Sequence, residues 1–141
     1  GAAGRERPQR LDFRIDTGKQ QALGVITERV AFDGSGGPLI VAASGAALAG
    51  KVDYQGWASM PNSYCPSCVI QYIVGLDSVG AGGCVNENVP PVYPGRSGQL
   101  RFALKAPTQP GSYVLRAGRT LDFSCKGAYP GGQFIGKVIV R

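Results

Sequence analysis

Hydrophobic and polar residues alternate along much of the chain with a period of two. In Leu11–Asp16 the apolar residues Leu11, Phe13 and Ile15 alternate strictly with charged residues. A period of two places successive side chains on opposite faces of a β-strand, whereas an amphipathic helix needs a period near 3.6. The pattern therefore predicts a strand with one buried face and one charged, solvent-exposed face.

Similar β-like segments recur along the chain, and no ten-residue stretch has a convincing helical pattern. Turn signals such as Asp33–Pro38 and the pair Pro110-Gly111 separate the segments, which are 22–32, 39–41, 51–57, 68–74, 100–105, 113–115, 121–123 and 134–140. The polar, proline-containing stretch 77–98 is expected to be a long loop, with its glycines 80, 82 and 83 in a turn. The chain is thus predicted to be all-β: a single-domain antiparallel β-sandwich of about eight strands.

Alternation also identifies the residues expected in the core: Phe13, Ile15, Val52, Ile70, Tyr72, Phe102, Leu104, Tyr113, Leu115, Val138 and Val140. The last strand, 134–140, is apolar on both faces. Such a strand is either internal to a sheet or covered by something else. In the second case we expect Ile135 and Ile139 to contact a protein partner or a second copy of the chain.

One hairpin carries a resemblance to a known architecture. The segment Phe102–Pro107, followed by a Pro-Gly turn and Tyr113-Val114-Leu115, resembles the penultimate hairpin of immunoglobulin-like and fibronectin-like extracellular domains. Trp57 departs from the cysteine–tryptophan–cysteine order of immunoglobulin domains, because it precedes the first cysteine. The resemblance implies a β-sandwich and no particular activity.

Length and charge narrow the picture further. The chain has 141 residues, which suits one domain, with residues 1–10 as a flexible polar N-terminal arm and 11–141 as the sandwich. The net charge is +6, but the basic residues are dispersed and no stacking aromatics interleave with them, so we expect no nucleic-acid partner. No apolar stretch approaches the ~20 residues of a transmembrane helix, so no transmembrane segment is expected.

Four cysteines are the most distinctive residues: Cys65, Cys68, Cys84 and Cys125. Two structural disulfides are the favoured interpretation, and pairing Cys65 and Cys68 with the other two is slightly preferred. A four-cysteine zinc site is the alternative, because a Cys-Pro-x-Cys turn can aim two thiolates at one ion. Redox chemistry is disfavoured, since the motif runs directly into a strand. Disulfides predict an exported mature chain, extracellular or periplasmic.

Catalytic signals are weak. The chain contains no histidine, which removes Ser-His and Cys-His arrangements and the commonest metal ligand. The pair Asp12 and Asp16 is interpreted as solvated charge, and the glycine-rich turns lack the Gly-Lys-Ser/Thr ending of a phosphate loop. We therefore expect no catalytic residue, no enzymatic activity and no cofactor.

Tyrosines supply the last candidate site. Tyr93 and Tyr129 each begin the tripeptide Tyr-Pro-Gly, and Tyr64 directly precedes a cysteine. If the cysteines gather these segments, the tyrosines would form binding loops, because tyrosine offers a large contact area at low entropy cost; otherwise each covers its own loop. The leading hypothesis is a non-enzymatic structural, adhesive or assembly module that binds a protein or itself. The alternatives are a carbohydrate-binding module and a small zinc-containing subunit of a larger complex.

Overall fold

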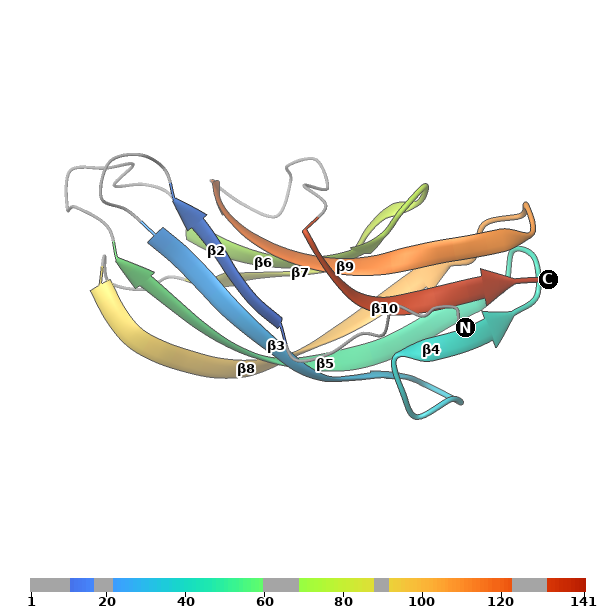
Figure 1. Cartoon of the computed structure of the whole chain (residues 1–141), viewed down its shortest axis with the longest axis horizontal. Coiled ribbons are helices and arrows are strands. Elements are labelled where there is room, and N and C mark those ends of the chain that lie inside the picture. Colours follow the sequence, from blue (N-terminus) through green and yellow to red (C-terminus); the bar gives the residue numbers. More distant parts are fainter. Residues whose placement is uncertain (1–10, 17–21, 60–68, 88–91, 123–131) are drawn as a thin grey trace.

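A computed structural model describes residues 11–16, 22–59, 69–87, 92–122 and 132–141. Within these residues every regular element is a strand and there is no helix (Figure 1). The strands are β2 (Leu11–Asp16), β3 (Ala22–Phe32), β4 (Leu39–Ala42), β5 (Ala47–Ser59), β6 (Val69–Leu76), β7 (Gly80–Glu87), β8 (Val92–Lys105), β9 (Gly111–Asp122) and β10 (Gln133–Val140). The predicted N-terminal arm, residues 1–10, lies outside the described residues.

The strands form two sheets that pack face to face (Figure 1). One sheet has the order β4-β10-β9-β6-β7 and the other the order β2-β3-β5-β8. This arrangement confirms the predicted all-β sandwich. One detail differs from the purely antiparallel prediction: β4 runs parallel to β10, with Val41 beside Ile139, whereas the other described pairings are antiparallel. Because β4 crosses from the end of β3 to the opposite sheet, its direction is set by that crossing and not by a hairpin.

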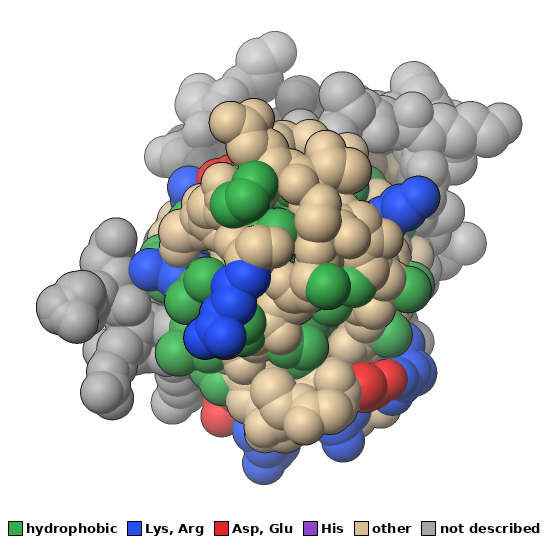
Figure 2. Space-filling view, turned by 90° about the vertical axis from the view of Figure 1, so that its right-hand side faces the viewer, with side chains coloured by type: hydrophobic (Ala, Val, Ile, Leu, Met, Phe, Trp, Pro, Cys, Tyr) green, Lys and Arg blue, Asp and Glu red, His purple; other side chains and the backbone are tan. Residues whose placement is uncertain are grey.

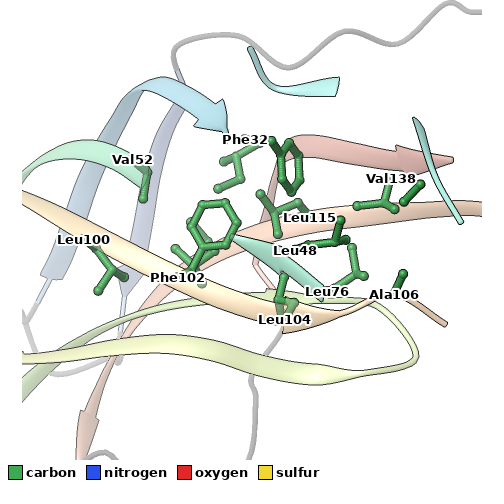
Figure 3. Packing of buried hydrophobic residues seen from close by; sticks show 14 of the residues in the cluster. Phe32, Leu48, Val52, Leu76, Leu100, Phe102, Leu104, Ala106, Leu115 and Val138 are labelled. Atoms are coloured by element: carbon green, nitrogen blue, oxygen red, sulfur yellow. The ribbon is translucent and has the colours of Figure 1, made fainter. Parts of the chain in front are cut away.

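The core fills the space between the sheets (Figure 3). Its aromatic centre is formed by Phe32 of β3 and Phe102 of β8, whose rings meet edge to face with centroids 5.5 Å apart. The predicted core residues that are buried are Val52, Tyr72, Phe102, Leu104, Leu115, Val138 and Val140, and Tyr113 packs partly buried against them. The side chains of Phe13, Ile15 and Ile70 lie outside the described part of the structure.

The predicted loop 77–98 is wrong. Among the described residues of this stretch, 77–79 form a turn and the others belong to β7 and β8, whereas 88–91 lie outside the described residues. The glycines of β7 are used for close packing: a Cβ on Gly82 would lie 2.3 Å from Leu104 Cδ2, and one on Gly83 would lie 3.0 Å from the Arg101 carbonyl oxygen. Glycine at these two positions therefore lets β7 approach β8 of the opposite sheet. The sequence predicts a turn here because glycines are common in turns. Their actual role, close packing against the opposite sheet, is a tertiary contact that the sequence does not show.

Ile135 is also placed differently from the prediction. Strand β10 is internal to its sheet, between β4 and β9, and Ile135 is fully buried in the core. A β-bulge causes this: Phe134 pairs with Arg116 and Gly136 with Leu115, which leaves Ile135 as the extra residue. The insertion shifts the alternation, so an isoleucine expected on the same face as Ile139 turns inward. Ile135 is thus excluded as a surface contact, whereas Ile139 remains exposed.

Candidate functional site: the apolar edge of the five-stranded sheet

Among the strands that the structure describes, β4 lies at one edge of the five-stranded sheet. The preceding turn is closed by hydrogen bonds from the Ser35 and Gly36 amides to the Phe32 carbonyl, and Gly34 and Gly36 adopt positive φ values of 92° and 73°. These angles favour glycine, which explains why the glycine-rich segment reverses the chain at this point. The turn delivers Pro38 and β4 to the side of β10 (Figure 1).

The backbone of β4 alternates between β10 and the open edge. The Lys137 amide donates to the Pro38 carbonyl at 2.9 Å, and the Arg141 amide donates to the Ala42 carbonyl at 3.1 Å. Since backbone groups of successive strand residues point in opposite directions, the N–H and C=O groups of Leu39 and Val41 point away from β10. Among the described residues no other strand pairs with this side of β4. The edge can therefore accept another strand.

Three apolar side chains lie on this edge and on the neighbouring strand. Leu39, Val41 and Ile139 are 48%, 51% and 40% exposed, and we call them the β4–β10 patch. Val41 and Ile139 are direct neighbours in the sheet. Val79, on the β6–β7 turn, is the other large apolar residue exposed in the described part of the chain. Among the described residues, the large exposed apolar side chains are thus concentrated at one edge, and an exposed apolar patch is typical of an interaction surface.

A hollow of about 550 Å³ adjoins the patch. It is bordered by Gly34 and Ser35 of the turn and by residues of β4 and β10. Strand β4 itself, Leu39–Ala42, carries no charged residue, although charges are a usual means of protecting an edge strand from pairing. Basic side chains lie beside the patch: Lys137 neighbours Leu39 in the sheet, and Arg141 follows β10. Figure 2 shows the end of the sandwich that carries the C-terminus, where hydrophobic side chains reach the surface among basic ones.

A second, polar hollow of about 450 Å³ lies on the four-stranded sheet, bordered by Glu28, Arg29, Asp53, Tyr54, Gln55, Ser97 and Gly98. Asp53 accepts hydrogen bonds from Gln99 Nε2 at 3.0 Å and from Arg29 Nε at 2.7 Å. The bond from Gln99, followed by that from Arg29, holds the pKa of Asp53 below its ordinary value. A carboxylate kept ionised by these bonds has no proton to donate near neutral pH, so Asp53 does not fit the role of a general acid.

The predicted cysteine site is described only at Cys84. This residue lies on β7 beside Ile73 of β6, and it is not a free thiol. Its neighbour Val85 packs against the core, so Cys84 faces the outer side of the sheet. Cys65, Cys68 and Cys125 lie outside the described residues. Within the described part of the chain no group of three potential metal ligands is found, and the choice between disulfides and zinc stays open.

The tyrosine prediction is corrected at one position. Tyr93 lies on strand β8, paired with Ala58 of β5, and not on a loop. Its tripeptide resembled a turn because Pro94 and Gly95 are typical turn residues, yet Pro and Gly are also tolerated in strands at edges and bulges. Strand β8 is an edge strand of its sheet, and the pairing with β5 is irregular between Gly56 and Ala58. Tyr64 and Tyr129 lie outside the described residues, so a tyrosine cluster stays a prediction.

Sequence reasoning missed two of the three patch residues. It identified the segment 39–41 as a strand and Ile139 as a contact, but it did not connect them. The sequence feature that could have indicated this site is the short apolar run 39–41, which contains no charged residue although edge strands often carry one. Its pairing with a strand near the C-terminus could not be deduced from local pattern.

Among the described residues, no helix has the length and apolar character required to cross a membrane. Comparisons of the chain with protein-family models, with curated proteins and with solved structures find no match.

Proposed function

We propose that the chain is a non-enzymatic assembly module that binds a protein, either a partner or another copy of itself, through the β4–β10 patch. The observation that carries this proposal is the combination of an edge strand without charged residues and exposed apolar side chains at Leu39, Val41 and Ile139. An added strand would satisfy the outward backbone groups of β4 while its side chains cover the patch. Strand addition of this kind draws affinity from backbone hydrogen bonds and specificity from alternate side chains.

The free energy gained by covering the patch is enough for a weak, specific interaction. Complete burial of a Val, Leu or Ile side chain contributes about 1.5–3 kcal/mol, so covering three half-exposed side chains contributes a few kcal/mol in total. Part of this is offset by the loss of translational and rotational freedom on association. A single patch of this size therefore suits a reversible contact, or one contact among several in a larger assembly.

The same proposal includes the location and the architecture of the chain. We place the module among exported, extracellular or periplasmic proteins with an immunoglobulin-like sandwich. The two packed sheets support that architecture, and the engaged thiol of Cys84 supports structural disulfides. The absence of histidine supports a non-enzymatic role. The carbohydrate-binding and zinc-containing alternatives depend mostly on residues outside the described part of the chain, whereas the β4–β10 patch is described and supports protein binding.

Peptide selection tests the proposal. A displayed library of extended peptides is selected on the wild-type chain and counter-selected on Val41→Lys, which places a charge in the patch. Selected peptides should show alternating apolar residues and bind at least ten-fold more weakly to Val41→Lys. The matched control is Val79→Lys, which changes another exposed valine, on the β6–β7 turn, and should leave binding intact. Peptides that bind all three proteins equally, or no enrichment at all, would refute a protein-binding patch at β4.

A further inference from the structure

The outward backbone groups of β4 can pair with those of a second β4. A two-fold axis at Ile40, perpendicular to the sheet, would set Leu39 opposite Val41 of the second copy, and Val41 opposite its Leu39. In an antiparallel ladder, opposed residues of this kind exchange both backbone hydrogen bonds. All N–H and C=O groups that Leu39 and Val41 direct to the open edge would then be satisfied. The pairing would join the two five-stranded sheets into one continuous sheet.

The side chains match under the same operation. Directly opposed residues of an antiparallel pair lie on the same face of the sheet. The observed neighbour pairs are Ile139 with Val41 and Lys137 with Leu39. Across the axis, the row Ile139–Val41 would continue into Leu39 and then Lys137 of the second copy. The exposed apolar side chains of both copies would thus meet in one continuous strip, as a self-complementary two-fold interface requires.

Charge is compatible with this geometry. The two Lys137 side chains would lie in different rows and on opposite sides of the strand contact, because Leu39 separates each Lys137 from that contact. Strand β4 adds no charge of its own. Like charges are therefore kept apart although the whole chain carries a net charge of +6. Residues 1–10 fit the patch less well as an occupant, because they contain no large aliphatic side chain and carry Arg5, Arg7 and Arg10 against the single acid Glu6.

We propose that the β4–β10 patch binds a second copy of this chain by antiparallel pairing of β4 with β4 about a two-fold axis at Ile40. This inference rests on the proposed function and specifies its partner. Strand β4 has only four residues, so the strand contact is too short to bury the ~1,200 Å² of surface typical of stable interfaces. The dimer is therefore reversible and forms at high protein concentration.

Sedimentation velocity over a concentration series up to about 1 mM tests the proposal, since a dissociation constant of that order corresponds to a weak contact. The mass of the wild-type chain should rise towards twice the monomer mass. Val41→Lys should abolish this rise, and Val79→Lys should leave it unchanged. Ile139→Lys serves as a second patch variant should Val41→Lys fail to fold, which circular dichroism reports. Hydrogen exchange of the Leu39 and Val41 amides should slow at least ten-fold between dilute and concentrated wild-type protein.

Three results would overturn the inference. One is a chain that stays monomeric at all concentrations. Another is a dimer that persists in both patch variants or is lost only when residues 1–10 are removed. The third is a dimer in which the Leu39 and Val41 amides exchange at unchanged rates. A monomeric chain that still binds selected peptides in a Val41-dependent way would overturn the second copy as occupant and leave the proposed function standing.

Discussion

The hydroxyl groups of Thr27, on β3, and Tyr72, on β6, lie 3.0 Å apart and connect the two sheets by a hydrogen bond through the interior. Both residues are buried, and the ring of Tyr72 stacks on that of Tyr54 with centroids 4.3 Å apart. A buried hydroxyl is costly unless it has a hydrogen-bond partner. The pair therefore fixes the relative position of β3 and β6 as well as contributing stability.

Removing both members of this pair should destabilise the fold by less than the sum of the two single removals. Tyr72→Phe takes away the hydroxyl that Thr27 contacts, and we expect a loss of about 1–3 kcal/mol in the free energy of unfolding. In Thr27→Val/Tyr72→Phe both partners are replaced by apolar groups of similar shape, so the loss should be smaller than the sum of the single losses. Urea unfolding of the four proteins gives the coupling energy, expected near 1 kcal/mol. Strictly additive losses would show that the two hydroxyl groups are not energetically coupled.

The glycines of β7 lead to a prediction about packing. Gly82→Ala would place a methyl group 2.3 Å from Leu104 Cδ2 and 2.7 Å from the Ala103 carbonyl oxygen, so β7 and β8 must move apart. Overpacking of this kind costs about 1–3 kcal/mol. Gly37→Ala is the control, because nothing lies within 4 Å of a Cβ at that position. Thermal unfolding should show a lower midpoint for Gly82→Ala and almost no change for Gly37→Ala; equal midpoints would contradict the close contact.

The fold class could be predicted from the sequence because it depends on alternation within single strands. Leu100, Phe102 and Leu104 illustrate this: they alternate with polar or small residues in the sequence and all three are buried in the structure. Burial on one face is a local property of a strand that packs against a second sheet. Every predicted core side chain that the structure describes is at least partly buried for this reason.

The candidate site could be predicted only in part, because it depends on relations between distant segments. Ile139 was identified from its own strand, but its neighbour Val41 is brought beside it by a parallel pairing across the whole chain. Ile135 was misplaced by a single bulge, which reverses the direction of a side chain without changing the local pattern. Gly82 was wrongly predicted to lie in a turn, because the reason for a glycine at this position is its close contact with β8 of the opposite sheet. Register, bulges and contacts between sheets are tertiary properties.

Arg29 adopts a backbone conformation that favours glycine. Its φ angle is +51°, at the irregularity between Glu28 and Ala31 where β3 and β5 shift register. A side chain in this region costs on the order of 1 kcal/mol, whereas an exposed ion pair such as Arg29–Asp53 contributes roughly 0–1 kcal/mol. Arg29→Gly should therefore change the free energy of unfolding by less than about 1 kcal/mol, because relief of strain offsets the lost ion pair.

Arg29→Ala is the informative comparison, since alanine loses the ion pair and keeps the unfavourable backbone conformation. Chemical denaturation should rank Arg29→Ala below Arg29→Gly in stability. Alanine is otherwise the more favourable residue, because it restricts the unfolded chain more than glycine does. A glycine variant less stable than the alanine variant would show that the left-handed conformation carries no strain here.

The lowered pKa of Asp53 predicts a pH dependence of stability. The hydrogen bond from Gln99 and then that from Arg29 favour the ionised carboxylate in the folded chain, so the folded pKa lies below the ordinary value of 3.8. The resulting contribution is fully present well above the unfolded pKa of 3.8 and is lost as the pH falls through the lowered folded pKa. The wild-type chain should thus lose more stability on acidification than Asp53→Asn, and the two should converge at the lowest pH.

The measurement is the denaturation midpoint of each protein between pH 7 and pH 2. Gln99→Met keeps the length of the side chain and removes the donor to Asp53, so it should reduce the difference between neutral and acidic pH in the same direction as Asp53→Asn. Asp33→Asn is the control for loss of one negative charge, because Asp33 forms an exposed ion pair with Arg101 at 2.8 Å elsewhere on the same sheet face. If Asp33→Asn reduced the acid sensitivity as much as Asp53→Asn, the effect would come from net charge, and the Gln99–Asp53 bond would not be its cause.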